Sequence, residues 1–462
     1  MSLCALGDPC NAFVLLCELK NGTSGEAIAT ALLTELNALG LTADLLKARL
    51  LGFCTDGASN LHGCVKGALQ LISRELNRNN IITFHCMNHK LELALHDAAS
   101  SVNMVSHLRT FMDTLYAYYS RSPEHSRQLE AISSTLGIEM RKIGRIFDVR
   151  WLSSSYQTVD AVYKSLPALV AHLLQSAEKA TTSKDRAKAQ GMAKKMQSWL
   201  FVVELGLMRD LLEVLKSLSL FLQSRSATIM QAKSRLDSVC LTLKAMKTAD
   251  SITLSDVKKQ IEETGKLHDM LVLPASQKDI EQFTQVRAQF IQAFVDNLTS
   301  RFPDRQLLEA GAILNPQSWP EDELERALYG DKEVLHMSNL CQVDQRQVLE
   351  EFRRYKSDAR DIGKGLSKLM ERVQLLPISS ADCERGFSCM NINDTPVRNR
   401  LSIESLSSLI FLKVNGPEPS AFDPSSYVEK WLREGHHAST DAPTGKKKEK
   451  AAAPSPWCTL FK

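Results

Sequence analysis

An apolar segment that ends on a carboxylate constrains the fold of this chain most strongly. Residues 50–54 (LLGFC) lead through Thr55 into Asp56, and Gly57 follows. A short apolar run bounded by small and polar residues is typical of a buried strand. Open α/β sheets place functional groups just beyond the carboxyl ends of such strands. Asp56 is therefore predicted either to bind a metal or to cap the next helix, and the cap is the favoured interpretation.

The first hundred residues alternate between strand and helix patterns. Strands are predicted at 12–19, 50–54 and 81–84, and helices at 25–39, at 60–76 and from about His89. This order indicates α/β architecture with a mainly parallel sheet. Three strands make a thin sheet, so further strands are expected to complete it.

The middle of the chain, about 100–375, has a helical pattern. A strongly apolar helix is predicted at 199–222, amphipathic helices at 228–248 and 277–300, and a polar, basic loop or frayed helix at 178–191. A short apolar helix is predicted at 406–414. The chain is expected to divide into an N-terminal α/β part at 1–100, a helical domain at 101–375 and a C-terminal part at 376–436. A disordered basic tail is expected at 437–462.

Composition excludes several classes of protein. The 462 residues carry a net charge of only +3, so nucleic-acid binding would need local patches of charge. No apolar stretch reaches the ~18 residues of a membrane span. Eleven cysteines without a Cys-x-x-Cys pair favour a reduced, intracellular compartment and argue against a zinc finger within the chain.

Four short clusters carry side chains that could take part in chemistry. The first is the strand-end Asp56, and the second is HCMNH at 85–89. The third is FDVRWLSS at 147–154, and the fourth is SSADCERGFS at 379–388. The first two clusters precede the long helical block, the third lies near its start, and the fourth follows it.

Together and in this order, the clusters resemble those of hAT-family transposases and their domesticated relatives over roughly 12–415. The resemblance implies a ribonuclease H-like fold that is interrupted by a large helical insertion and closed by a C-terminal hAT dimerisation region. It also implies an Asp-Asp-Glu triad that holds two Mg²⁺ or Mn²⁺ ions for phosphoryl transfer on DNA.

The correspondence with the family's triad is partial. Asp56 matches the second acidic residue and Glu384 the third. The chain is expected to begin inside the family's first hairpin, with its turn at 7–11, so that the first strand and its Asp are missing. The family's N-terminal zinc-finger module is expected to be missing too. Two carboxylates are not expected to hold both ions, so no cofactor is predicted unless the protein is active.

Two further elements match the family. Cys86 and His89 match a Cys-x-x-His element, but they supply two of the four ligands of a structural zinc site, and packing near the sheet edge is the favoured interpretation. Arg150 and Trp151 match an Arg-Trp element that lies near the active site of the transposases. Trp151 is more often a core residue than a platform for a DNA base.

The C-terminal region matches the family's dimerisation region. The predicted dimer residues are all apolar, and together they present more apolar surface than one short helix can bury by itself. They are Leu401, Leu406, Leu409, Ile410 and Leu412. The alternative is that they complete the core, and both roles are compatible. The basic run 446–450 is predicted to be a nuclear import signal, with a solubilising tail as the alternative.

Three functions remain open at this point. The favoured one is a non-catalytic nuclear protein that acts through homodimerisation and protein contacts, with possible residual DNA binding. The second is an active metal-dependent transposase. The third is a SUMO-ligase-type nuclear adaptor, in which the run 373–376 adds a strand to a partner's sheet.

Overall fold

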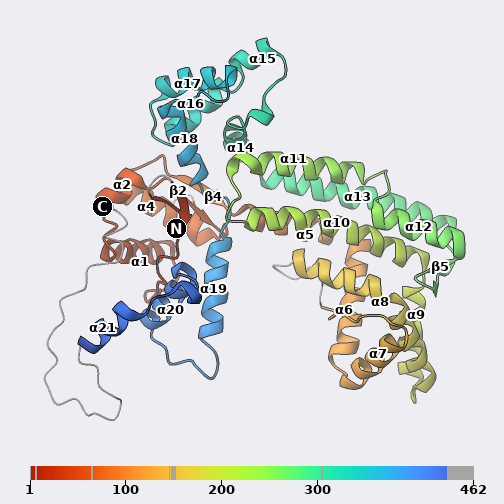
Figure 1. The fold of residues 1–462 in the computed structure, drawn as a ribbon. Coiled ribbons are helices and arrows are strands. Elements are labelled where there is room, and N and C mark those ends of the chain that lie inside the picture. The colour runs from red at the N-terminus through yellow and green to blue at the C-terminus, as the bar shows by residue number, and fades with distance from the viewer. Residues whose placement is uncertain are drawn as a thin grey trace, which may run out of the picture. The chain divides into compact units, whose positions relative to one another are not determined.

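The computed structural model describes residues 2–5, 8–63, 66–144, 146, 152–302 and 305–433. The protein is mainly helical, with small two-stranded sheets. The chain divides into two compact units. The terminal unit combines the residues up to Thr83 with those from Gln374 onward, and the helical unit spans Phe84–Val373. Figure 1 labels most of the helices and some of the strands.

The terminal unit begins with an antiparallel hairpin. Strand β1 (Ser2–Ala5) pairs with β2 (Asp8–Asn11), with Cys4 opposite Pro9. The prediction of a turn over 7–11 was therefore wrong, because residues 8–11 form a strand. Proline lacks the N–H that a central strand would need, but an outward-facing edge in a two-stranded pair tolerates it.

The next elements of the terminal unit follow the predicted order, with one additional helix at Ala43–Arg49 that was not predicted. They are α1 (Gly25–Ala38), α2 (Ala43–Arg49), β3 (Gly52–Thr55), α3 (Ser59–His62), α4 (Ala68–Glu75) and β4 (Ile82–His85), whose last two residues belong to the helical unit. Ser24 caps α1, because its hydroxyl accepts from the Ala27 N–H across 3.2 Å. The single helix predicted at 60–76 is divided in two. Glycine is a poor helix former, and Gly63 and Gly67 lie at the break.

A small apolar core holds these elements together. Ala29 of α1 and Ile72 of α4 are buried in it, and Phe53 of β3 packs against its edge. Strands β3 and β4 are neighbours in a two-stranded sheet, and the Ile82 N–H donates to the Leu51 carbonyl across 3.0 Å. Beta structure was thus correctly predicted at both places. The larger sheet that was expected around them is not present among the described residues.

The segment 12–19 is not a strand, contrary to the prediction. Its backbone is bound instead by side chains of α20 (Ile403–Asn415). The Phe13 N–H donates to Asn415 Oδ1, and the Leu16 N–H donates to Ser407 Oγ across 3.0 Å. Hydrogen bonds to a helix satisfy part of the extended backbone that a neighbouring strand would otherwise pair.

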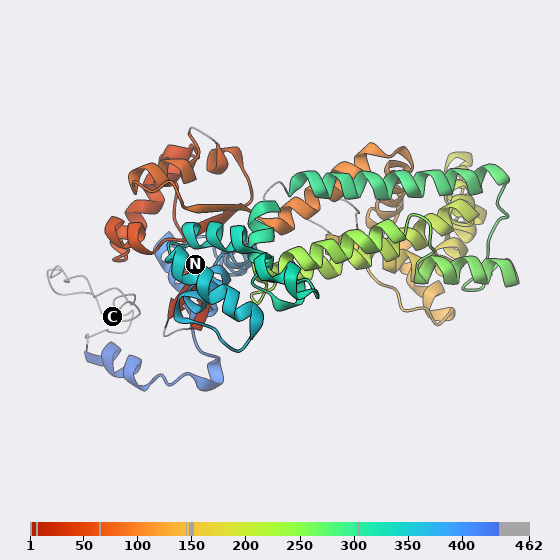
Figure 2. The same ribbon diagram turned by 90° about the horizontal axis from the view of Figure 1, so that it is seen from above.

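The helical unit is organised around α10 (Trp199–Gln223), which is buried on almost every side over its first half. The elements that pack against α10 are α5 (Met87–Ser101), α8 (Leu152–Lys179), α9 (Ser183–Met196), α11 (Ile229–Ala245), α12 (Ile252–Thr264) and α13 (Gln277–Arg301). Figures 1 and 2 show α10 and α13 running alongside each other. The strongly apolar helix and both amphipathic helices were correctly predicted.

Shorter elements complete the helical unit. They are α6 (Asn103–Ser120), α7 (Pro123–Thr135), β5 (Lys266–Leu267), β6 (Met270–Leu271), α14 (Arg305–Ala312), α15 (Glu323–Leu328), α16 (Asp331–Leu340), α17 (Gln345–Ser357) and α18 (Lys364–Gln374), whose last residue belongs to the terminal unit. The basic stretch predicted as a loop or frayed helix at 178–191 was interpreted wrongly. It spans the end of α8 and most of α9, which is a regular helix because Ala189, Met192, Ala193 and Met196 bury one face.

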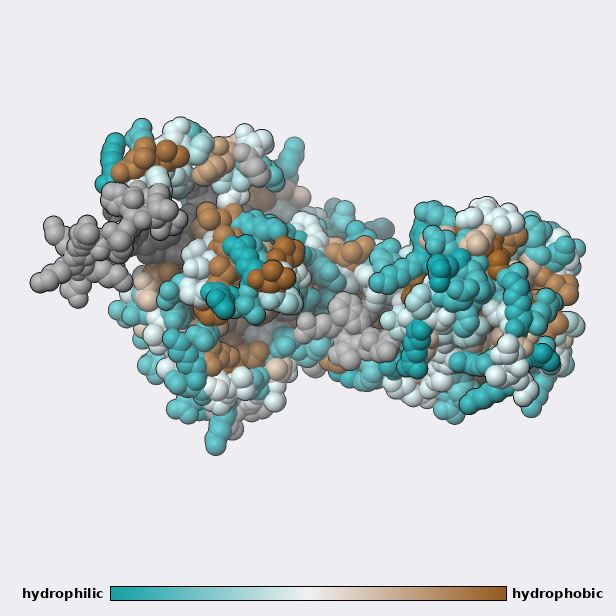
Figure 3. Space-filling model, turned by 90° about the horizontal axis from the view of Figure 1, so that it is seen from below, coloured by the Kyte–Doolittle hydropathy of each residue, from teal (hydrophilic) through white to brown (hydrophobic). Residues whose placement is uncertain are grey.

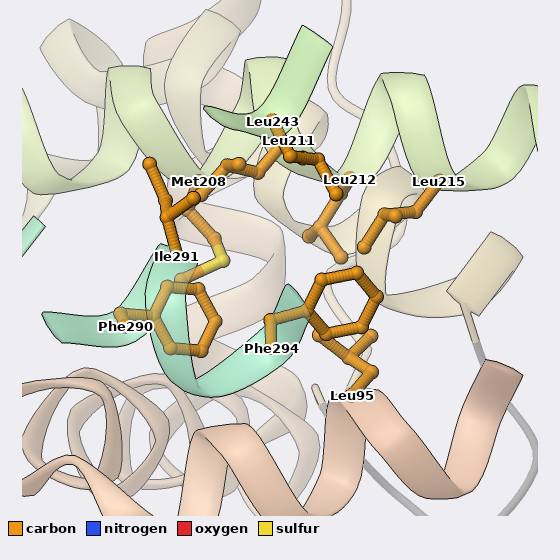
Figure 4. A pocket seen from close by; sticks show the side chains of 9 residues that line it. All are labelled: Leu95, Met208, Leu211, Leu212, Leu215, Leu243, Phe290, Ile291 and Phe294. Carbon is orange, nitrogen blue, oxygen red and sulfur yellow. The ribbon is translucent and has the colours of Figure 1, made fainter. Parts of the chain in front are cut away.

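The interior of the helical unit is closely packed. A cavity of about 10 Å³ lies between α5, α10, α11 and α13, and Figure 4 shows the apolar side chains that line it, among them Leu95, Met208 and Phe294. This volume is at the lower limit for holding one water molecule, and a cavity without polar partners stays dry. It is a packing defect rather than a ligand pocket. Within the described ranges, no helix combines the length and apolar character that crossing a membrane requires.

Candidate functional site

Asp56 lies at the end of β3, in the position that the sequence predicts. Its side chain is exposed, and Oδ1 accepts a hydrogen bond from the Ala58 N–H across 3.2 Å. The N-cap residue of α3 is Ala58, which makes no side-chain cap. The interpretation of Asp56 as the helix cap was therefore wrong. It forms an Asx turn that leads the chain from the strand into the helix.

Glu384 lies in the first turn of α19 (Ala381–Asn393), in the same unit as Asp56. Its side chain is exposed. Acidic residues are favourable in this position because the helix N-terminus carries a partial positive charge. Arg385 forms a local ion pair with Asp382 across 2.8 Å.

Metal binding needs several donors at one point in space. Across the part of the chain that the structure describes, no group of three or more His, Cys, Asp or Glu side chains is placed to hold a metal ion. The described residues therefore do not assemble the two-metal site that the resemblance implies around Asp56 and Glu384.

Cys86 and His89 lie at the start of α5 in the helical unit. Cys86 is the N-cap residue and is fully buried, and its carbonyl accepts from the Lys90 N–H across 3.0 Å. His89 is half-buried, with its ring 5.5 Å from that of His85 between centroids. Cys86 is thus a packed residue at the strand-to-helix junction. Arg150 and Trp151 lie outside the described residues.

The predicted dimer residues separate into an inner and an outer group. Leu406 and Ile410 are buried against Cys389 of α19, and Leu401 packs at the edge of this cluster. Leu409 is half-buried, and Leu412 is 63% exposed. The core role therefore holds for Leu401, Leu406 and Ile410, whereas only Leu409 and Leu412 point toward the surface.

The short run proposed as a SUMO-binding strand is not extended. Residues up to Gln374 belong to α18, and Val373 and Leu376 are buried. A segment that adds to a partner's sheet needs an accessible backbone and free side chains. The only local support for the adaptor function is therefore removed.

Sequence reasoning missed a cluster of charges in the helical unit. Asp160 of α8 is buried, and Arg141, Lys164 and Arg209 approach its carboxylate to 3.2, 2.8 and 2.8 Å. Burial alone would raise the pKa of Asp160, but the hydrogen bonds from Lys164 and Arg209 outweigh it, so the pKa lies below its ordinary value. The sequence signal that could have indicated this cluster is Asp160 itself, an acidic residue among the apolar residues of α8.

A second buried acid lies on α10. Glu204 is 7% exposed, and burial raises its pKa to about 8, although Lys195 opposes the shift. The carboxyl group is therefore held mainly neutral at physiological pH.

No protein-family model matches the chain.

Proposed function

We propose that this is a non-catalytic, hAT transposase-like nuclear protein with a ribonuclease H-like ancestry, which acts by binding a second copy of itself and other proteins. The observation that carries the proposal is the outward pair Leu409 and Leu412 on α20. The two residues are three positions apart, so they are neighbours on the helix surface. Their helix is already anchored by Leu406 and Ile410, so the outer pair is available for a partner.

Further apolar side chains are exposed in the same C-terminal region. Those on α19 and on α21 (Ser425–Arg433) are Phe387, Ile392, Tyr427, Val428, Trp431 and Leu432. Exposed apolar surface of this kind is typical of subunit interfaces. Figure 3 shows hydrophobic patches that interrupt the hydrophilic surface on one face of the molecule.

Light scattering after size exclusion tests the self-association. The wild-type chain is expected to have a mass near twice 51.5 kDa, and the double change Leu409→Asp and Leu412→Asp is expected to give the monomer. The matched control is Leu241→Asp, which changes a leucine that is 70% exposed on α11. A monomeric wild type at micromolar concentration, or a double variant that remains dimeric, would contradict the proposal.

A separate assay tests the absence of catalysis. Supercoiled DNA is incubated with the chain and Mg²⁺ or Mn²⁺, and no nicking is expected. The alternative is an active transposase, in which the exposed Asp56 carboxylate would hold a metal ion, because metal-dependent nucleases bind their ions at strand-end carboxylates. Nicking that Asp56→Ala abolishes would favour the active transposase instead.

Nuclear import is tested through the basic run 446–450. A fluorescent fusion of the full chain is expected to accumulate in nuclei, and replacement of the four lysines by glutamine is expected to abolish the accumulation. Equal distribution of both fusions would argue against a nuclear role.

A further inference from the structure

The loop that joins α19 to α20, residues 394–402, contains an exposed turn with the sequence Thr-Pro-Val-Arg. Thr395 and Arg398 face each other across this turn in an isolated antiparallel bridge. The Arg398 N–H donates to the Thr395 carbonyl across 2.8 Å, and the Thr395 N–H donates to the Arg398 carbonyl across 3.3 Å. Pro396 stabilises the turn, because its fixed φ is the one that the second residue of a β-turn adopts.

The Thr395 hydroxyl is accessible to an enzyme. Its oxygen accepts a hydrogen bond from the Arg398 N–H across 3.2 Å, which leaves its own proton available. Residues 396–400 are all exposed, and Val397 at the tip of the turn is 97% exposed. A residue that precedes proline is already restricted to extended backbone conformations. An enzyme could therefore straighten this segment without unfolding either of the helices that flank it.

Two arginines lie beside this hydroxyl. Paired residues of an antiparallel bridge project their side chains to the same side, with Cβ atoms about 4.5–5.5 Å apart, so Arg398 can reach a group attached to Thr395. Arg400 is exposed two residues further along the loop. Neither arginine forms an ion pair with another residue that the structure describes. Guanidinium groups match the oxygens of a phosphate, although Asp394 and Glu404 nearby oppose a further negative charge.

We propose that Thr395 is a phosphorylation site for a proline-directed serine/threonine kinase, and that Arg398 and Arg400 hold the phosphate. The Thr395 oxygen attacks the γ-phosphorus of ATP, the bond from that phosphorus to the bridging oxygen breaks, and ADP leaves. The hydroxyl proton passes to the catalytic base of the kinase. The loop carries Asp394 and the two arginines, so its charge would change from +1 to about −1. The inference does not depend on self-association through α20.

A second Ser-Pro pair in the described part of the chain provides an internal comparison. The Ser122 hydroxyl caps α7, because it accepts from the His125 N–H across 3.2 Å, and Pro123 is the first residue of that helix. A kinase binds its substrate segment in an extended conformation, so the first turn of α7 would have to unfold. That helix also packs against α8. Ser122 is therefore expected to be modified much more slowly than Thr395.

The first experiment incubates the full chain with ATP, Mg²⁺ and a proline-directed kinase that prefers a basic residue three positions after the hydroxyl. Fragmentation of tryptic peptides by mass spectrometry locates each phosphate and follows it over time. We expect Thr395 to approach full occupancy while Ser122 remains almost unmodified. A synthetic peptide of residues 391–402 serves as the positive control for the activity of the kinase.

Three substitutions in the full chain sharpen this result. Thr395→Val keeps the shape of the side chain and should abolish phosphorylation at this position. Arg398→Gln should slow the modification severalfold, because the kinase loses the basic residue that it prefers. The matched control is Arg346→Gln, which removes an exposed arginine from α17 and should leave the rate unchanged.

A second experiment tests whether the arginines hold the phosphate. The second pKa of a phosphothreonine is ordinarily about 6, and neighbouring cations lower it because they favour the dianion. Phosphorus NMR of the fully phosphorylated chain should therefore show a titration midpoint a few tenths of a pH unit below that of the double variant Arg398→Gln and Arg400→Gln. The acidic neighbours are the same in both proteins, so the difference reports the arginines. The difference should shrink at high salt.

Three results would overturn the proposal. The first is an unmodified Thr395 in the full chain under conditions in which the peptide is phosphorylated. The second is modification of Ser122 as fast as that of Thr395, because accessibility of the turn would then not matter. The third is an equal phosphorus titration midpoint in the wild type and the double arginine variant.

Discussion

The side-chain amide of Asn415 forms two hydrogen bonds with the backbone of Phe13. The Phe13 N–H donates to Asn415 Oδ1 across 2.8 Å, and Asn415 Nδ2 donates to the Phe13 carbonyl across 2.7 Å. An amide side chain has one acceptor and one donor group, so it pairs with a residue of extended backbone as a neighbouring strand would. This pair joins residues that are 402 positions apart and closes the terminal unit.

Replacing the Asn415 amide tests how much these two hydrogen bonds contribute to the stability of the terminal unit. Asn415→Ala leaves a partly buried N–H and carbonyl without their partner, and we expect a loss of about 1–3 kcal/mol in local stability. Hydrogen exchange should show faster exchange at Phe13 and Leu16. The control is Ser408→Ala, because the Ser408 hydroxyl bonds only within its own helix, to the Glu404 carbonyl. Unchanged protection at Phe13 would show that the pair adds little.

The inner and outer leucines of the C-terminal region should respond differently to truncation. Ile410→Ala empties a fully buried position and should lower the free energy of unfolding by about 2–5 kcal/mol. Leu412→Ala should change it by less than about 0.5 kcal/mol in the monomer, because the side chain is mostly exposed. Urea denaturation of the two variants measures both values. Similar losses at the two positions would contradict the division into inner and outer groups.

Glu204 makes stability depend on pH in an unusual direction. Its folded pKa of about 8 lies above its ordinary value of 4.5, so its favourable contribution is complete below pH 4.5. As the pH rises from 4.5 to 8, the unfolded chain ionises while the folded chain does not, and stability falls by several kcal/mol.

Removing the ionisable group should remove this dependence. Glu204→Gln is expected to be more stable than wild type at pH 8 and to lose less stability between pH 5 and pH 8. Thermal melts across this range measure the effect, with the exposed Glu178→Gln as control. Parallel pH profiles for wild type and Glu204→Gln would refute the assignment.

Asp160 should show the opposite dependence. Its folded pKa lies below the ordinary 3.8, so the stability it contributes is present above that value and is lost as the pH falls through the folded pKa. Asp160→Asn leaves Arg209 facing a neutral group in the interior. We expect a loss of about 2–4 kcal/mol, less than for a fully buried pair, because Arg141 and Lys164 remain partly solvated. The difference from wild type, measured by urea denaturation, should be constant from pH 5 to pH 8.

The helical predictions were mostly correct because they depend on local signals. The helix at 277–300 begins after Ser276, whose hydroxyl and Asp279 form a capping box that can be read from four consecutive residues. The apolar helix at 199–222 follows from composition alone. Features of this kind involve only residues that are close in the sequence, so a helix can be predicted from them without knowledge of its tertiary contacts.

The candidate site was less accessible to prediction. Asp56 was located correctly at the strand end, but its role depends on which N–H its carboxylate meets, and that is Ala58 rather than a metal or a helix terminus. The five apolar residues from Leu401 to Leu412 look alike in sequence. Their inner or outer position depends on where Cys389 and Phe13 lie.

Local sequence signals suffice to place most helices and the strands at Phe53 and Phe84. Long-range contacts alone establish that residues 12–19 bind to α20 without forming a strand, and that most of the basic stretch 178–191 is a regular helix with one buried face. The physical reason is that periodicity and capping are local, whereas burial and hydrogen-bond partners come from residues that are remote in the chain.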